Sequence, residues 1–234
     1  MLMYNEQAFS ATLGIPMNPC TKTSAPMSTP PACLAHPLLD RAMAGVMKGA
    51  QDGDLPLWAW TLGLPQAELV LLVQSWFPEL GVLERMPEVQ YAALQRSVPE
   101  DFHPLASLLA AASSGIAPER HTRGLAHAVA AACFGERHLW QDLDLADRES
   151  LSGLMHTYFG ALASRNTRRL RWKWFLFGEL DTRLGRSPTV PAGCRKCEEF
   201  ERCSDGAVHE PGCSRNPCEV VMVRPGYLKG PDHH

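Results

Sequence analysis

The spacing of hydrophobic residues is helical along most of the chain. From Leu38 to Met47, apolar side chains recur every three or four residues, which is the period of one face of an amphipathic helix. Similar periods, with many Ala and Leu residues, cover 89–94, 102–112 and 118–134. Outside 220–223, no run alternates convincingly with the two-residue period of a strand. The sequence therefore predicts an all-α fold.

Two further apolar stretches, 57–80 and 139–162, resemble each other at a distance of 82 residues. At that shift, Leu57, Trp58, Leu69, Leu72, Val73, Trp76, Phe77 and Leu80 fall on Leu139, Trp140, Leu151, Leu154, Met155, Tyr158, Phe159 and Leu162. We interpret the match as a pseudo-repeat of two related helical halves, in which all these positions are core residues. The alternative is that any two Leu-rich amphipathic helices would agree to this extent.

Composition divides the chain into three parts. Residues 1–35 contain five prolines among Ser and Thr and have no regular period, which is typical of a flexible arm. Residues 36–184 carry the helical periods and are predicted to form a single helical domain. Residues 185–234 hold five of the eight cysteines and begin where Gly185 and Pro188 end the last helix, so we expect a cysteine-rich, irregular metal-binding tail.

Charge and hydropathy restrict the compartment and the partners. A formal net charge of −3 gives no overall reason to expect binding to nucleic acid or to an anionic membrane. No apolar run reaches the roughly 18 residues that a transmembrane helix needs, and residues 1–11 lack the features of a secretory signal. We therefore expect a cytoplasmic protein. Cysteines there are more typical of metal sites or clusters than of disulfides, although Cys133, on an Ala-rich helix, is expected to be buried.

A basic amphipathic helix is predicted to begin at Arg165. Five positive charges fall within nine residues: Arg165, Arg168, Arg169, Arg171 and Lys173. One interpretation is a solvated face whose long side chains cover apolar surface. The other is a surface for an anion or a protein partner, because guanidinium groups bind oxyanions through paired N–H donors. Arg168, Arg169 and Arg171 are the candidate anion or partner patch.

The cysteines after this helix have the spacing of metal ligands. Cys194-x2-Cys197 lets two thiolates reach one metal centre, and Cys203 follows after five further residues. Cys213 and Cys218 come later. On spacing alone, a structural zinc site and an iron–sulfur cluster are equally compatible with this pattern. The histidines His103, His121, His127, His138 and His156 are dispersed, and each is expected to be hydrogen-bonded or exposed and not a ligand.

Several sequence blocks, taken in order, resemble the NifQ family of nitrogen fixation, which donates molybdenum for nitrogenase cofactor assembly. These blocks are His138-Leu139-Trp140-Gln141-Asp142-Leu143, Arg165-Asn166-Thr167, Arg171-Trp172-Lys173-Trp174-Phe175 and Cys194-x2-Cys197-x5-Cys203. The resemblance covers about residues 55–206 and rests on the order and spacing of the blocks together. It implies a carrier of metal or cluster, not an enzyme.

The resemblance also implies a site and partners. Cys194, Cys197 and Cys203 would hold an iron–sulfur cluster. Molybdenum, arriving as molybdate, would be reduced there, held as a molybdenum–iron–sulfur species, and passed to the nitrogenase cofactor-assembly proteins. The family signature has a further cysteine at the position that is Thr189 in this chain. The fourth ligand would then be Cys213 or Cys218, or three thiolates would hold a three-iron cluster with an open corner for molybdenum, or the cluster would be lost.

Two other classes of function fit the residues alone. A helical binding module with a structural zinc tail would use the basic helix to bind protein or nucleic acid, although the net charge argues against nucleic acid. An iron–sulfur electron carrier would hold a cluster without molybdenum. A hydrolase or phosphotransferase has no support, because the sequence contains no Gly-rich phosphate loop, HExxH or GxSxG motif.

Overall fold

The computed structural model describes residues 36–77, 84–198 and 200–201. All regular elements within these ranges are helices, which confirms the predicted all-α fold. In chain order they are α2 (Pro37–Asp52), η1 (Leu57–Thr61), α3 (Gln66–Trp76), α4 (Glu88–Arg96), α5 (Phe102–Ala110), α6 (Glu119–Ala132), α7 (Leu139–Asp142), α8 (Arg148–Tyr158), α9 (Gly160–Ala163), α10 (Trp172–Leu184) and η3 (Cys194–Lys196). The predicted arm at 1–35, residues 220–223 and most of the predicted tail lie outside the described residues.

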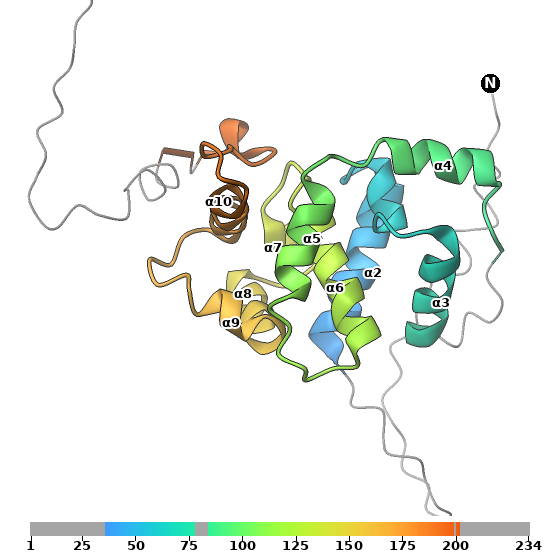
Figure 1. The fold of residues 1–234 in the computed structure, drawn as a ribbon, viewed down its shortest axis with the longest axis horizontal. Coiled ribbons are helices and arrows are strands. Elements are labelled where there is room, and N and C mark those ends of the chain that lie inside the picture. The colour runs from blue at the N-terminus through green and yellow to red at the C-terminus, as the bar shows by residue number, and fades with distance from the viewer. Residues whose placement is uncertain (1–35, 78–83, 199, 202–234) are drawn as a thin grey trace, which may run out of the picture.

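Helices α2, α5 and α6 form the centre of the molecule, with α3 and α4 on one side and α7 to α10 on the other (Figure 1). Helix α6 is buried without interruption from Ala128 to Cys133, and its small side chains let neighbouring helices approach closely. Phe102 of α5 is fully buried, and its ring packs edge-on against Trp58 at 5.1 Å. No helix in the described ranges is long and apolar enough to cross a membrane.

The predicted pseudo-repeat is visible in the bounds of the helices. A shift of 82 residues places α3 on α8 at both ends, and the first residue of α2 on the first residue of α6. Leu62 and Asp144, which follow η1 and α7, are separated by the same shift, and both have a φ of 51°. Residues other than glycine rarely adopt this left-handed conformation. Its recurrence supports a first half (α2, η1 and α3) and a second half (α6, α7 and α8).

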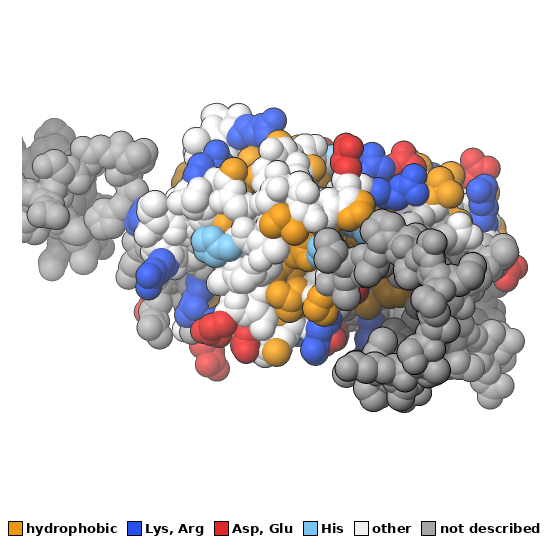
Figure 2. Space-filling view, turned by 90° about the horizontal axis from the view of Figure 1, so that it is seen from below, with side chains coloured by type: hydrophobic (Ala, Val, Ile, Leu, Met, Phe, Trp, Pro, Cys, Tyr) orange, Lys and Arg blue, Asp and Glu red, His pale blue; other side chains and the backbone are white. Residues whose placement is uncertain are grey.

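Most of the paired apolar positions lie in the core, as predicted. Buried examples are Leu69, Leu72 and Val73 in the first half and Leu151, Leu154 and Met155 in the second. The assignment of Leu57 to the core is wrong, because its side chain is 61% exposed. It begins η1 directly after Pro56, and the next residue, Trp58, takes the buried position. Figure 2 shows other hydrophobic side chains at the surface near the middle of the face seen from below.

Candidate functional site

A cavity of about 820 Å³ lies beside the first turn of α10. Its walls come from 136–141, α8, the turn at 166–171 and the segment 193–200. We call this last segment, without the undescribed residue 199, the cysteine segment. In Figure 1 the cysteine segment lies above α10, and α8 and α9 lie below it. The polar and charged lining residues are Glu136, Arg137, His138, Gln141, Arg148, Ser152, His156, Asn166, Arg169, Arg171, Lys173, Cys194, Lys196, Cys197 and Glu198.

This cavity collects residues that the sequence analysis had selected separately. Cys194 and Cys197 line it, and so do Arg169 and Arg171 from the candidate patch. Arg168, which lies next to them in the chain, is exposed and does not line the cavity. The remaining candidate ligands, Cys203, Cys213 and Cys218, lie outside the described residues.

The cysteine segment is positioned by a close contact with the backbone of the 136–141 segment. Gly193 has a φ of 71°, and a Cβ added there would lie 2.2 Å from the carbonyl oxygen of Glu136, so only glycine fits. Directly after it, η3 forms one turn in which the N–H of Cys197 donates to the carbonyl of Cys194 at 3.1 Å. Lys196 also pairs with the Glu136 carboxylate at 3.2 Å. Both thiols are therefore brought, half-buried, to the same cavity.

Thr189, at the position of the additional family cysteine, makes hydrogen bonds to a buried carboxylate. Its N–H and its hydroxyl donate to the two carboxylate oxygens of Asp181, at 2.6 and 3.0 Å. Asp181 is 3% exposed and also accepts from Nε of Arg186 at 2.6 Å. Arg186 in turn holds Asp101 through two bonds of 2.7 and 2.8 Å. Thr189 does not line the cavity, and it fixes the chain beyond α10 to α10 itself, while Arg186 makes the contact with Asp101 before α5.

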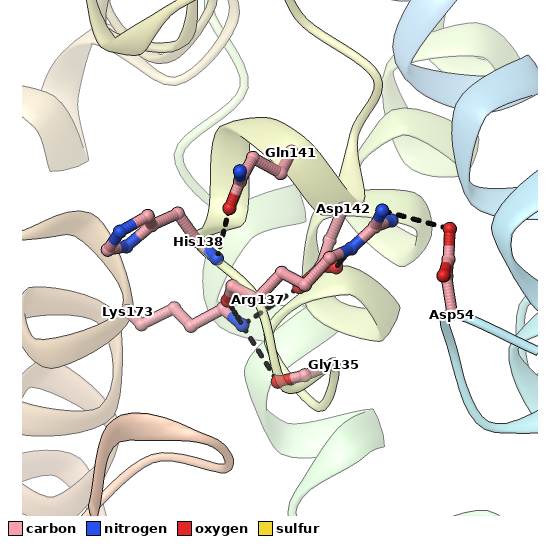
Figure 3. A network of polar contacts seen from close by, with 7 residues as sticks. All are labelled: Asp54, Gly135, Arg137, His138, Gln141, Asp142 and Lys173. Carbon is pink, nitrogen blue, oxygen red and sulfur yellow. Dashed lines mark hydrogen bonds and ion pairs between the residues drawn. The ribbon is translucent and has the colours of Figure 1, made fainter. Parts of the chain in front are cut away.

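A buried polar network holds α10 against the 135–142 segment (Figure 3). The Nζ of Lys173 donates to the carbonyls of Gly135 and Arg137, at 2.9 and 2.6 Å, and to Asp142 at 3.0 Å. Lys173 is 5% exposed and Asp142 1%. Arg137 donates to the other oxygen of Asp142 at 3.0 Å and reaches Asp54, before η1, at 2.9 Å. Burying such charges is costly unless each is paired and hydrogen-bonded, and here each is.

The sequence analysis missed this network. It counted Lys173 among the surface charges of a basic helix, whereas the side chain is buried at the floor of the cavity. A signal was present: Lys173 precedes Leu176, Phe177 and Leu180 by three, four and seven residues, which is the spacing of the apolar face. A lysine on such a face needs a buried acid, and Asp142 supplies it.

The helix predicted from Arg165 begins only at Trp172, so its predicted start is wrong. The side chain of Asn166 causes the difference. Its Oδ1 accepts from the N–H of Leu170 at 2.8 Å and its Nδ2 donates to the carbonyl of Leu170 at 2.9 Å. The N–H of Arg169 donates to the carbonyl of Asn166 at 3.0 Å. Such local side-chain bonds offer the backbone an alternative to the helix, and they place Arg169 at a φ of 53°.

Helix α8 presents Arg148, Ser152 and His156 to the cavity, one turn apart. The hydroxyl of Ser152 accepts from the indole N–H of Trp172 at 3.1 Å, and the His156 ring packs edge-on against the same indole at 6.2 Å. The Arg148 guanidinium lies 3.4 Å from Nε2 of His138. Figure 3 shows the His138 ring pointing away from the buried ion pairs. The sequence analysis had treated these histidines as isolated, because only the packing of α7 and α8 brings them together.

The cavity is cationic although the chain as a whole is anionic. Six Arg or Lys residues and two Glu residues line it, whereas the formal net charge of the chain is −3. Lys and Arg side chains also stand at the left end of Figure 2, the end at which Figure 1 shows α8 to α10. A concave surface lined by one sign of charge concentrates ions of the opposite sign. The cavity can therefore attract a small anion and offer it two thiols.

The two cavity cysteines differ chemically from Cys133. Cys133 is fully buried, as predicted, and burial raises the pKa of its thiol to about 12, so it stays protonated and unreactive. Cys194 and Cys197 are half-buried, and arginine and lysine side chains line the same cavity. No group of three His, Cys, Asp or Glu side chains in the described part of the chain is arranged to hold a metal ion. Within the described residues, the cavity supplies two thiols, those of Cys194 and Cys197.

Known proteins share this sequence pattern. The NifQ family model matches residues 42–205. Protein NifQ of Azotobacter vinelandii is 30% identical over 167 residues, which are 68% of this chain and 84% of that protein. A NifQ homolog of Sinorhizobium fredii is 32% identical over 142 residues, covering 60% of this chain and 59% of its own length. Protein NifQ of Rhodobacter capsulatus is 29% identical over 142 residues, covering 61% and 74%. No solved structure matches this chain.

Proposed function

This chain belongs to the NifQ family, and from that membership we propose that it carries molybdenum on an iron–sulfur site for synthesis of the nitrogenase iron–molybdenum cofactor. The family places the chain in nitrogen fixation and molybdenum processing. In the proposed role molybdenum is cargo: it enters as molybdate and leaves to a cofactor-assembly protein. The chain then acts as a carrier and turns over no substrate of its own.

One observation carries the proposal: thiols and cations share one cavity. Cys194 and Cys197 supply thiolates, which are the usual ligands of iron–sulfur clusters. The surrounding arginines and lysines balance the negative charge of a thiolate-bound cluster and of an incoming oxyanion. Cys203 is the proposed third ligand, with Cys213 or Cys218 as the fourth. When bound, the cluster would supply sulfur ligands to molybdenum.

The residues around the thiols prepare the site. Gly193 allows the cysteine segment to pack against Glu136, and Lys173 fixes the 135–142 segment from below. These contacts bring the two thiols and the cationic wall to a common space.

Metal analysis of protein purified without oxygen, from cells supplied with iron and molybdate, tests the proposal. We expect brown protein that contains iron and molybdenum, and we expect Cys197→Ser to lose both. Cys133→Ala is the matched control, because that thiol is buried outside the cavity, and it should retain both metals. Colourless wild-type protein with about one zinc per chain would overturn the proposal in favour of a structural zinc tail.

A further inference from the structure

Arg169 combines a strained backbone with an unpartnered charge. Its φ of 53° is one that side-chain-bearing residues rarely adopt. Among the described residues, its guanidinium has no hydrogen-bond or ion-pair partner, yet it lines the cavity. Strained residues persist where the surrounding contacts fix them, and they concentrate at functional sites. Neither the backbone conformation of Arg169 nor an ion pair of its side chain therefore stabilises the fold.

The strain has an identifiable cause. Asn166 holds the backbone of Leu170 through both atoms of its amide, and its own carbonyl accepts from the N–H of Arg169. These three bonds close the turn and force Arg169 into the left-handed region. The turn separates two adjacent arginines, since Arg169 lines the cavity and Arg168 does not.

Other anion-binding groups surround the same space. Arg171, the residue before α10, lines the cavity, and α10 begins with no side-chain cap and no acidic residue in its first turn. Arg148 and His156 line it from α8. The acidic lining residues, Glu136 and Glu198, belong to the other walls, and Glu136 is paired with Lys196.

We propose that Arg169, with Arg171, Arg148 and His156, forms a binding subsite for a small tetrahedral oxyanion of charge −2, held by side chains other than the thiols. Guanidinium groups suit this ligand class because their planar fork donates two parallel hydrogen bonds to a pair of oxygens. The identification of the anion as molybdate rests on the proposed function. Binding of the oxyanion itself requires neither a cluster nor a cysteine.

The test uses the full-length chain with Cys194→Ser and Cys197→Ser, so that thiolate and cluster chemistry at these positions is absent. Molybdate binding is measured by isothermal titration calorimetry in chloride buffer. Arg169→Gly should weaken binding by about 10- to 100-fold, the value of a charged hydrogen bond, without lowering Tm, because glycine accepts the positive φ. Asn166→Ala should also weaken binding, although every arginine remains.

Arg168→Ala is the matched control, because it removes the same charge from the neighbouring position, and it should leave affinity within about twofold. Equal losses from Arg168→Ala and Arg169→Gly would overturn the subsite in favour of a diffuse charged surface. Absence of molybdate binding in the chain with Cys194→Ser and Cys197→Ser would also overturn it, even if wild-type protein loads iron and molybdenum. Conversely, wild-type protein that never loads iron and molybdenum would reject the carrier function. The subsite would still stand if molybdate binding depended on Arg169.

Discussion

The two halves of the pseudo-repeat share a backbone plan, but they present different chemistry at matching positions. Helix α3 carries Gln66, Val70 and Gln74 where α8 carries Arg148, Ser152 and His156. In the first half, the amide of Gln66 is used to bind the carbonyl of Met86 at 2.9 Å. In the second half, the matching face lines the large cavity. The comparison shows that one helical unit can serve as a scaffold in one copy and as a site in the other.

The helices that follow the two halves are attached by different forces. Helix α4 is fixed by neutral hydrogen bonds: Tyr91 donates to the carbonyl of Leu64 at 2.6 Å, and Gln95 donates to the same carbonyl at 2.9 Å. Helix α10 is fixed by the buried pair of Lys173 and Asp142. The second attachment uses polar contacts beside an open cavity, where apolar packing is not available on every side. We expect the two attachments to respond very differently to loss of a single group.

The largest effect should come from Lys173→Met. This change leaves Asp142 buried with only Arg137 to compensate it, and breaking a buried pair costs about 3–5 kcal/mol. Tyr91→Phe removes the corresponding contact of the first half and should cost about 1 kcal/mol, because Gln95 still donates to the Leu64 carbonyl. Urea denaturation measures both free energies of unfolding. Similar losses of stability in the two variants would show that α4 and α10 are held by contacts of similar strength.

A smaller effect on stability, but a large one on the site, is expected from Gly193→Ala. The added Cβ would meet the Glu136 carbonyl, and the positive φ would be strained, so the cysteine segment must move at a cost of about 1–3 kcal/mol. Iron and molybdenum content should fall sharply. Gly178→Ala on α10 is the control, since a Cβ there meets nothing within 4 Å, and it should stabilise the chain by about 0.5–1 kcal/mol with unchanged metal content. Normal metal loading by Gly193→Ala would show that metal binding does not depend on the position of the cysteine segment.

The body of the molecule was largely predictable from the sequence, because its helices are held by apolar faces that repeat along the chain. Helix α6 follows from the local period, and the correspondence of α3 with α8 follows from the internal sequence match at a shift of 82 residues. The start of α10 was not predictable in this way, because the side chain of Asn166 competes with the helix for the backbone of Leu170. The burial of Lys173 depends on Asp142, which lies 31 residues earlier in the chain. The apolar spacing places Lys173 on the buried face, but it does not identify the acid that pairs with it.

The sequence selected candidate residues for the site but did not predict how they are arranged. Cysteine spacing selected Cys194 and Cys197, and charge selected Arg169 and Arg171. Charge alone did not distinguish Arg168 from Arg169, because the turn that separates them depends on the side-chain hydrogen bonds of Asn166. The contribution of α8 became visible only through packing.

The smallest effect concerns the contact between the halves at His127, whose Nδ1 lies 2.8 Å from the carbonyl oxygen of Leu62. Burial lowers the pKa of His127 below its usual value, so the unfolded chain binds a proton more readily than the folded one. The stability from the neutral ring is therefore complete above about pH 7 and is lost as pH falls through the usual histidine pKa of about 6.5. His127→Gln should make the free energy of unfolding decline less steeply between pH 7 and 5. If the free energy of unfolding, measured by denaturation at each pH, declines equally in His127→Gln and in wild-type protein, a group other than His127 titrates in this range.

The most direct test of the central claim is molybdenum K-edge X-ray absorption on anaerobically purified protein loaded with iron and molybdate. If the thiols and cations of one cavity process molybdenum together, wild-type protein should show molybdenum with sulfur ligands and iron neighbours. Purified Cys197→Ser should lack both metals, and molybdate added to it afterwards should show only an oxygen shell, held by the cationic wall. An oxygen-only spectrum in wild-type protein, or a sulfur and iron shell that survives Cys197→Ser, would contradict the account.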